Sequence, residues 1–390
     1  MRTLLATTSG AGHVLPLLGI AKACQSLGHD VLVVGPAGGA ETLARSNLDH
    51  VLGEDPPADA ADRVWAEFGS LPRDQASVVV EREWFMGLCA TALLPAVEDA
   101  VASFRPDVIV REPCEYASAV VADRLGIPRL NIGISTAAAE MGVLTSLVRS
   151  DLDGKSPGLA DRLITDPYLT RFPESLDPSP FPATVRYRDD APLEHSKPIA
   201  LDDAWGGSTA PLIYVTLGTV AMRQPIGREV LRFLVGELAA LDVRVLATTA
   251  GATGLGDLGR GAANVHVAAW VPQQIALGAS SLVVCHGGSG TTFGALAAGV
   301  PLVFVPLFAD QPTNARLVES AGAGVALSSG DASAQANALL HEGHAGRLRA
   351  AVREVLADPA YRAAAGVIGD ELAKLPTAQE AIVRALALRV

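Results

Sequence analysis

The sequence predicts an α/β protein built from two doubly wound, parallel-sheet domains that face each other across a cleft. Three observations support this fold class. Strand-like apolar runs alternate with helical periodicity in both halves of the chain, a glycine-rich turn follows a strand in each half, and a Pro-, Asp- and Gly-rich stretch at 189–209 separates the halves. The 390 residues suffice for two domains, each with its own core. Ligands of such sheets bind at the carboxyl ends of the strands, where we expect the functional residues.

The composition narrows the class of protein. Lys and Arg number 30 against 42 Asp and Glu, a formal charge of −12, which argues against a protein that coats nucleic acid. The hydrophobic fraction of 49% argues against wholesale disorder. Four scattered cysteines form no CxxC pair, so we expect buried thiols in a reducing, cytoplasmic compartment. The most apolar window, 295–309, is short and contains Gly and Pro, so no membrane span is predicted.

The first half opens with a strand, a turn, a helix and a second strand. An apolar run at 3–7 leads into a glycine-rich turn at 9–13, and helical spacing continues to Leu27. Another apolar run follows at 31–34, and this order of elements implies parallel strands. The same order recurs further along as a strand at 108–110, a helix at 116–125 and a strand at 129–132.

Three longer stretches of the first half are less uniform. Residues 78–104 have the pattern of one long helix that carries several aromatic residues. Residues 55–75 and 135–182 are rich in Pro, Asp and Ser and lack periodicity, so we expect loops or short helices that cover a cleft.

The second half repeats the alternation of strands and helices. Strands are predicted at 212–216, 244–248, 265–268, 282–285, 302–305 and 325–327, helices at 226–241, 289–298 and 311–321, and further helices from 328 to the end. We therefore expect a domain at 1–200, a second at 201–372, and a terminal helix at 373–390 that packs back on the first domain.

The most specific motif is the glycine turn at 285–292. It follows a strand and opens a helix, so its main-chain N–H groups and the helix dipole can hold a phosphate or diphosphate. The residues concerned are His286, Gly288, Ser289, Gly290 and Thr291. The alternative is a tight turn without a ligand. The turn is neither a P-loop, since no Lys follows its last Gly, nor a dinucleotide fingerprint.

Other candidates follow strands of the same predicted sheet. Asp310 and Gln311 could bind a polyol, although Asp310 could instead cap a helix. Trp270 could stack on a planar ring while the main chain of Val271 pairs with a base edge, unless Trp270 belongs to the core. The polar turn that includes Gly218 and Thr219 faces the same edge.

In the first half, His13 lies in the glycine turn after the first strand. An imidazole accepts a proton at neutral pH, so His13 is a candidate general base, and the alternative is a histidine that only serves the start of its helix. Three aromatic residues, Trp65, Trp84 and Phe85, could line an apolar binding surface or belong to the core.

These motifs together resemble a known family. The segments 270–273 (WVPQ), 286–291 (HGGSGT), 299–301 (GVP) and 310–311 (DQ) are similar, in order and spacing, to the donor-binding signature of family-one glycosyltransferases with the GT-B fold. The segment 10–16 is similar to the glycine, His and Pro landmark near the start of that family. The resemblance covers essentially the whole chain and is strongest to bacterial enzymes that glycosylate natural products.

The resemblance implies roles for these residues. Trp270 and Val271 would hold the nucleotide base, and His286 and residues 288–291 would hold the diphosphate. Gly218 and Thr219 would approach the phosphates or the sugar, and Asp310 and Gln311 would bind the sugar hydroxyls. His13 would be the general base. The family has an Asp to orient that base where this chain has Glu112, and whether the longer side chain can serve is left open.

The function implied is inverting transfer of a deoxysugar from a nucleotide-diphosphate donor, with dTDP expected as the nucleotide. The acceptor expected is an apolar natural-product aglycone, bound near Trp65, Trp84 and Phe85. No metal or other cofactor is expected, because the Asp-x-Asp motif at 151–153 lies in a polar segment rather than after a strand. The alternatives are a nucleotide-sugar epimerase of the same fold and a catalytically silent helper subunit. No nucleic-acid partner is expected, and a homodimer is left open.

Overall fold

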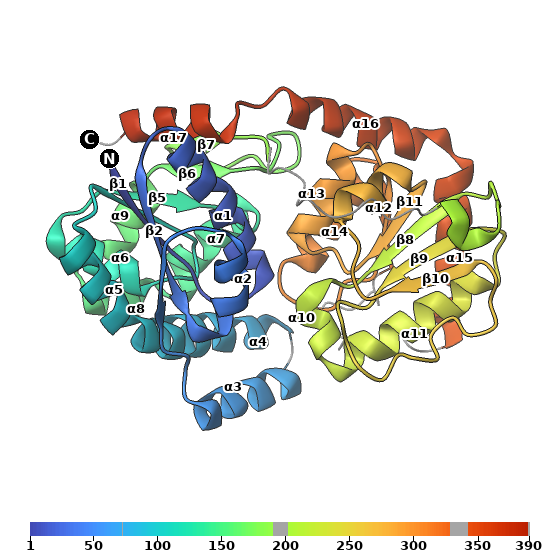
Figure 1. Ribbon diagram of the computed structural model, residues 1–390, viewed down its shortest axis with the longest axis horizontal. Helices are drawn as coiled ribbons and strands as arrows, with labels where there is room; N and C mark the ends of the chain where they lie inside the picture. The colour runs from blue at the N-terminus through green and yellow to red at the C-terminus, as the bar shows by residue number, and fades with distance from the viewer. Residues whose placement is uncertain (72, 190–201, 328–341, 389–390) are drawn as a thin grey trace. The chain divides into compact units, whose positions relative to one another are not determined.

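The computed structural model describes residues 1–71, 73–189, 202–327 and 342–388, which form two compact units (Figure 1). Unit 1 comprises Met1–Ala191 and Lys374–Val390, and unit 2 comprises Pro192–Ala373. The domain boundary expected at residues 200 and 201 lies at the edge of a segment outside the described residues.

Unit 1 contains a parallel sheet that has seven strands within the described residues. Its order, β3-β2-β1-β4-β5-β6-β7, is that of a doubly wound sheet, so the predicted fold class is confirmed for this unit. The three strands that the sequence analysis missed are β3, β6 and β7, which are only three or four residues long. The strands are β1 (Arg2–Ala6), β2 (Asp30–Pro36), β3 (His50–Gly53), β4 (Val108–Arg111), β5 (Arg129–Ile132), β6 (Tyr168–Thr170) and β7 (Thr184–Arg186).

The helices of unit 1 include several in the two regions, 55–75 and 135–182, where loops or short helices were expected. Residues 55–75 contain a three-turn helix, α3, because Val64, Trp65 and Phe68 give it an apolar side. The helices are η1 (Ala37–Gly39), η2 (Val80–Cys89), η3 (Val143–Leu147), α1 (Ala11–Ser26), α2 (Ala40–Arg45), α3 (Ala58–Ser70), α4 (Arg73–Val79), α5 (Ala90–Phe104), α6 (Ala117–Leu125), α7 (Ala137–Gly142), α8 (Arg149–Lys155), α9 (Leu159–Thr165) and α17 (Ala378–Ala387).

Successive residues of β1 point to opposite faces of the sheet and build two cores. Leu4 packs with Leu93 and Val97 of α5 on one face. Leu5 packs with Leu17 of α1 and Ile382 of α17 on the other. Burial on both faces explains why the central strands read as continuous apolar runs.

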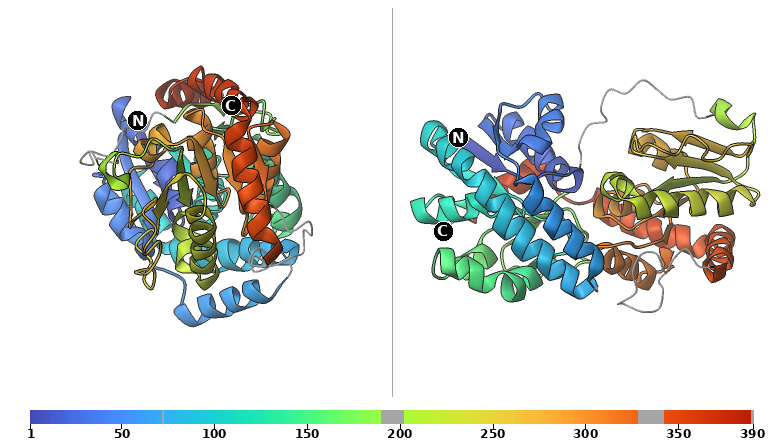
Figure 2. Two further views of the ribbon diagram at one scale, coloured as in Figure 1. Left: turned by 90° about the vertical axis from the view of Figure 1, so that its right-hand side faces the viewer. Right: turned by 90° about the horizontal axis from the view of Figure 1, so that it is seen from below.

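The long helix expected at 78–104 is a continuous helical stretch, Gln75–Phe104, that runs through α4, η2 and α5 along one side of unit 1 (Figure 2). Its middle, η2, is wound as a π-helix. By length and composition alone this stretch could cross a membrane, a possibility that the sequence analysis had overlooked. In the structure this stretch is a core helix of a globular domain, because Leu93, Val97 and Ala100 lie in the core of unit 1.

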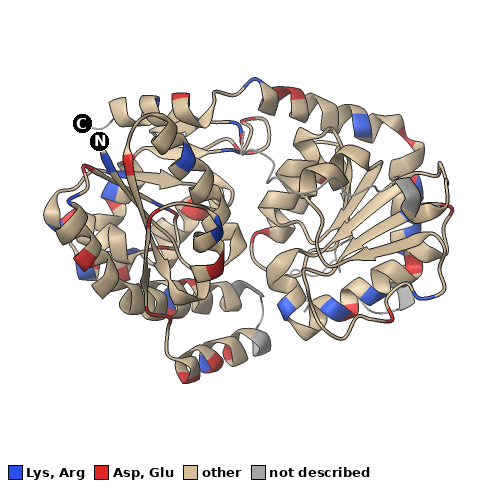
Figure 3. Ribbon diagram, viewed as in Figure 1, with Lys and Arg blue, Asp and Glu red and all other residues tan. Residues whose placement is uncertain are grey.

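Unit 2 contains a parallel sheet with six strands in the described residues, ordered β10-β9-β8-β11-β12-β13. This is the same doubly wound order, so the predicted second α/β domain is confirmed. Among these strands the only charged residue is Arg244, and Figure 3 shows the strand ribbons almost entirely in the colour of uncharged residues. The strands are β8 (Leu212–Thr216), β9 (Arg244–Thr248), β10 (Val265–Ala268), β11 (Leu282–Cys285), β12 (Leu302–Phe304) and β13 (Gly324–Ala326).

Helices cover both faces of this second sheet. Leu231 and Leu234 of α11 pack with Val352 of α15 against one face, and α12 and α13 contact the other. The helices of unit 2 are η4 (Asp202–Trp205), α10 (Gly218–Arg223), α11 (Pro225–Ala239), α12 (Gln273–Ala279), α13 (Ser289–Ala297), α14 (Gln311–Ser320), α15 (Glu342–Ala357) and α16 (Pro359–Ala373).

The last helix, α17, belongs to unit 1 although it follows unit 2 in the sequence. A capping box formed by Thr377 and Glu380 starts it, and Ala381, Ile382 and Ala385 are buried against α1 and the sheet. The C-terminal residues therefore complete the core of unit 1.

Replacing Ile382 with Ala tests this docking. Ile382 is 1% exposed, so its truncation leaves a cavity, and we expect the free energy of unfolding of unit 1 to fall by about 2–5 kcal/mol. Urea unfolding followed by circular dichroism measures the change. The control is Val383→Ala on the same helix, where the side chain is 54% exposed and a change within about 0.5 kcal/mol is expected. Equal effects of the two substitutions would contradict the docking.

Candidate active site

In unit 1 the candidate site lies where β1 and β4 end side by side. The order of the sheet reverses between these two strands, and such a switch point leaves an open crevice beyond the strand ends. The pairing register sets Ala6 beside Arg111, so the residues that follow each strand meet. Thr8 follows β1, and Glu112 follows β4.

Glu112 is fully buried and holds His13. A carboxylate oxygen, Oε2, lies 3.2 Å from Nδ1 of His13. The other oxygen, Oε1, accepts hydrogen bonds from the main-chain N–H of Thr8 (3.1 Å) and its hydroxyl (2.8 Å), and Oε2 accepts one from the N–H of Cys114 (2.7 Å). Gly10 adopts φ of 108° in the turn that brings His13 to the start of α1.

These contacts keep Glu112 ionised. Burial raises the pKa of this carboxyl, but the imidazole of His13 and the donors of Thr8 and Cys114 outweigh burial and lower its pKa to about 2. An ionised carboxylate at Nδ1 favours the tautomer with its proton on Nδ1, which leaves Nε2 able to accept a proton. The longer Glu side chain thus reaches the imidazole of His13.

The η2 segment brings further groups to His13. The ring of Phe85 lies 5.2 Å from the imidazole, centroid to centroid. The hydroxyl of Tyr116 donates to Glu81 at 3.4 Å. Burial and the charge of Glu112 raise the pKa of Glu81 to about 7, although His13 and the Tyr116 hydrogen bond oppose the shift. Sequence reasoning missed Glu81, since nothing in a local pattern indicates which residue of a long helix meets a distant turn.

The three aromatic candidates of unit 1 do not form a single group. Phe85 is beside His13, whereas Trp84 lies 5.2 Å from Trp65, which in turn lies 5.5 Å from Phe68. Trp65 is 38% exposed, so it is not a core residue. The structure thus brings Phe85 to the site, and it places Trp65 and Trp84 in a neighbouring aromatic cluster.

In unit 2 the candidate residues follow neighbouring strands. β8, β11 and β12 are adjacent and parallel, so their carboxyl ends lie at one edge of the sheet. Gly218 and Thr219 follow β8, the 286–291 turn follows β11, and Asp310 follows β12. As in unit 1, the switch point of the sheet, here between β8 and β11, lies within this edge.

The imidazole of His286 is packed between two glycines. A Cβ on Gly218 would lie 2.9 Å from the ring, and one on Gly288 would lie 2.5 Å from its Nε2, so neither position has room for a side chain. Burial lowers the pKa of His286 to about 4, against an opposing hydrogen bond to the main chain of Thr216. The imidazole is therefore neutral at pH 7, so it faces a ligand without a positive charge.

The N-terminus of α13 can bind an anion beside this histidine. The first N–H groups of a helix have no partner within it, and here they belong to Ser289, Gly290 and Thr291. The Thr291 hydroxyl accepts a hydrogen bond from the Gln273 amide (3.0 Å), which ties the 270–273 motif to this helix. Gln273 and Thr291 are 18 residues apart in the sequence, and this hydrogen bond connects the two motifs.

A hydrogen-bond network fixes Asp310, and it includes a residue that the sequence analysis missed. The Ser289 hydroxyl donates to Oδ2 of Asp310 at 2.6 Å. The amide of Asn314 donates to the same oxygen (3.0 Å), to the Ser289 hydroxyl (3.1 Å) and to the carbonyl of Gly287 (2.9 Å). Asp310 is the N-cap residue of α14, but its side chain makes no capping hydrogen bond, and Oδ2 accepts from Ser289 and Asn314 instead. The only sequence signal for Asn314 is its place one helical turn after Asp310.

Gln311 and the 270–271 segment also follow strands of the unit 2 sheet. Oε1 of Gln311 accepts the N–H groups of Leu307 (2.8 Å) and Phe308 (3.1 Å), which leaves its amide nitrogen for a ligand. Trp270 is 54% exposed, so the core alternative is wrong for this residue, while Val271 is buried.

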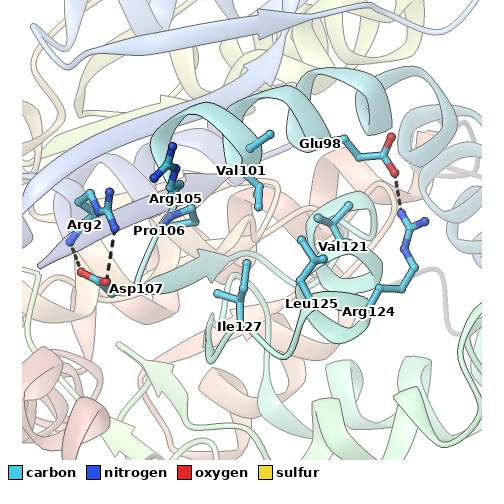
Figure 4. Close-up of a pocket in the computed structure, with 11 residues that line it drawn as sticks. Arg2, Glu98, Val101, Arg105, Pro106, Asp107, Val121, Arg124, Leu125 and Ile127 are labelled. Carbon is cyan, nitrogen blue, oxygen red and sulfur yellow. Dashed lines mark hydrogen bonds and ion pairs between the residues drawn. The ribbon is translucent and has the colours of Figure 1, made fainter.

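Two other features lie outside this site. The pocket in Figure 4 is at the opposite, amino-terminal end of β1 and β4, between Val101 and Ile127, and is flanked by the Arg2–Asp107 ion pair. The Asp-x-Asp motif is part of α8 instead of the polar loop that was expected, and Asp151 pairs with Arg82 at 2.9 Å.

Comparison with known proteins identifies the family. Residues 232–388 match the family described as erythromycin biosynthesis protein CIII-like, C-terminal domain. The chain is 30% identical over 395 residues to elloramycin glycosyltransferase ElmGT of Streptomyces olivaceus, which covers 98% of this chain and 96% of that protein. It is 31% identical to L-demethylnoviosyl transferase of Streptomyces niveus, covering 97% and 95%. The chain belongs to the antibiotic-pathway glycosyltransferases.

Solved structures agree with this assignment at the level of the fold. Spinosyn rhamnosyltransferase SpnG superposes with a TM-score of 0.77 at 21% identity, covering 99% of this glycosyltransferase and all of SpnG. SnogD from Streptomyces nogalater superposes with a TM-score of 0.73 at 24% identity, covering 100% and 99%. The fold of this glycosyltransferase is therefore the GT-B fold that the sequence predicted.

Replacing Asn314 with Asp tests the network around Asp310. The change is nearly isosteric, but it removes buried hydrogen bonds and adds a carboxylate beside Asp310, so we expect a loss of about 1–3 kcal/mol in unfolding free energy at pH 8. The neighbouring carboxylate raises the pKa of the introduced carboxyl in the folded state, so the loss is present above that pKa and shrinks as the pH falls to 5. Thermal unfolding of variant and wild type at both pH values measures this. An equal loss at both would contradict a charge-based cause.

Proposed function

We propose that this glycosyltransferase moves a deoxysugar from a dTDP-sugar to a hydroxyl of an apolar natural-product aglycone, with inversion and with His13 as the general base. The observation that carries the proposal is the 3.2 Å contact between Nδ1 of His13 and the buried Glu112 carboxylate. It orients an imidazole at the carboxyl edge of a parallel sheet and keeps Nε2 as its proton acceptor.

Unit 2 supplies a donor site in this proposal. The main-chain N–H groups of α13 and the neutral imidazole of His286 hold the diphosphate, and Trp270 offers its exposed indole to the base, whose edge pairs with the main chain of Val271. Gly218 and Thr219 approach the phosphates or the sugar, and Asp310 and Gln311 bind sugar hydroxyls. In support, SpnG has been solved with thymidine diphosphate and with spinosyn aglycone.

The proposed reaction is a single displacement at the anomeric carbon. Nε2 of His13 takes the proton of the acceptor hydroxyl as that oxygen bonds to the anomeric carbon. The bond between this carbon and the β-phosphate oxygen breaks, and its electron pair leaves with the nucleoside diphosphate on the opposite face, so the configuration inverts. Charge that develops on the leaving phosphate is stabilised by the N–H groups and the dipole of α13. Glu112 positions His13 and stabilises the imidazolium that forms.

The two alternatives raised by the sequence are not favoured. The relatives that share the whole chain are named glycosyltransferases and not epimerases. A silent helper subunit would have no need of the intact pair of His13 and Glu112. No step of the proposed reaction uses a metal ion, so transfer is expected to persist in a chelator.

His13→Ala is expected to lower kcat by about 10²–10⁴-fold, because the proton acceptor is lost, while the Kd for dTDP in calorimetry stays unchanged. A matched control is His50→Ala. His50 is also in unit 1, but its Nδ1 contacts the carbonyl of Leu48 in the same segment, so transfer should continue. Undiminished transfer by His13→Ala would overturn the assigned base.

The donor nucleotide is tested by thermal shift. A bound ligand stabilises the folded state by mass action, so dTDP is expected to raise Tm more than UDP at equal concentration, with or without EDTA. Trp270→Ala should weaken dTDP binding by about 1–3 kcal/mol through loss of stacking, and Trp65→Ala, in unit 1, should not. A larger shift with UDP, or none with either nucleotide, would be evidence against the donor proposed.

A further inference from the structure

A cysteine thiol lies beside the base and its carboxylate. A ring nitrogen of His13, a carboxylate oxygen of Glu112 and Sγ of Cys114 all lie within 4.8 Å of one another, and Nδ1 is the nitrogen that contacts Glu112. Cys114 is close because its main-chain N–H donates to Glu112 at the turn after β4. It is only half-buried, which corrects the expectation that all four cysteines are buried. The proposed transfer reaction leaves this thiol without a role.

The three side chains form a donor set that suits zinc. Imidazole nitrogen, carboxylate oxygen and thiolate sulfur are the ligands that Zn²⁺ takes in tetrahedral sites, at about 2.0–2.3 Å. Two ligands on such an ion are about 3.3–3.7 Å apart. The 3.2 Å between His13 and Glu112 is close to that spacing, so a modest adjustment of the Cys114 side chain would complete three corners. Mg²⁺ and Ca²⁺ prefer all-oxygen shells and fit poorly.

The charges around the cluster also favour a dication. Glu112 is ionised and buried, and its negative charge acts on Cys114. Burial and this carboxylate keep the thiol protonated in the absence of a cation. When zinc binds, the thiol releases one proton to solvent, and the charge of the three side chains changes from −1 to −2. The two positive charges of the ion then neutralise the site.

We propose that His13, Glu112 and Cys114 form an inhibitory zinc site, an inference that rests on the role of His13 proposed above. Coordination uses the lone pair of Nδ1. The one proton of the neutral imidazole must then lie on Nε2, the atom that has to be bare to accept the acceptor's proton. Zinc therefore switches the tautomer and blocks the base, and it also removes Glu112 from its positioning contact.

Binding is tested on the intact protein with Co²⁺ as a spectroscopic substitute, in buffer free of thiol reductants. A stoichiometric thiolate-to-cobalt charge-transfer band is expected for the wild type, and Zn²⁺ should displace it. Cys114→Ala and the more conservative Cys114→Ser should lack the band and weaken binding by more than about 100-fold, while still folding with the main-chain N–H that serves Glu112. Cys89→Ala is the matched control, since Cys89 is the other half-buried cysteine, and it should keep the band. The absence of a band in the wild type, or its survival in both Cys114 variants, overturns the site.

Inhibition is measured as the ratio of transfer rates with and without micromolar Zn²⁺ in each variant, so that differences in basal rate cancel. The wild type and Cys89→Ala should be inhibited at least about tenfold and recover with EDTA, and Cys114→Ala should be insensitive. Cobalt binding without zinc inhibition overturns the inference. The His13→Ala experiment then decides separately whether the proposed base falls with it, because that variant needs no metal.

Discussion

The candidate chemistry of this glycosyltransferase depends on one buried carboxylate. Glu112 can remain ionised inside the protein because three hydrogen-bond donors and the imidazole of His13 converge on it, and two of the donors, the N–H and hydroxyl of Thr8, come from the turn after a neighbouring strand. β1 and β4 pair in parallel, and the register that places Ala6 beside Arg111 brings the turns after the two strands together. A shift of this register would separate donor from acceptor and leave a buried charge unpaired.

The sheet of unit 2 has the same kind of switch point, but different residues lie at it. There the first strand and its neighbour across the switch point, β8 and β11, present glycines and a helix N-terminus in place of a charged pair. The glycines leave room for an imidazole whose burial keeps it neutral. Unit 1 thus concentrates a fixed negative charge, and unit 2 offers N–H donors, which suits a proton acceptor in one and a phosphate in the other.

The sequence predicted the central strands because they are buried on both faces and must be apolar throughout. It missed β6 and β7, whose three residues each are too few for a pattern. At the site, the residues that follow strands were found, because strand ends can be read from the sequence. Asn314 and Glu81 were not found, because each acts through a partner in another element, Gly287 and Tyr116, and no local periodicity encodes such contacts. The sequence likewise could not show that the Glu112 side chain reaches His13, because that contact depends on the tertiary structure.

The π-helical winding of η2 has a consequence for how the substrate range of such an enzyme can change. A π-turn accommodates more residues than an α-turn between the same flanking helical segments. Removal of a residue from Val80–Cys89 would tighten part of this winding toward that of an α-helix and rotate the residues before it relative to those after it. Glu81 and Phe85 would then change direction relative to the imidazole of His13. Length variation in this segment can therefore alter the surroundings of His13 through a change outside the strands of the sheet.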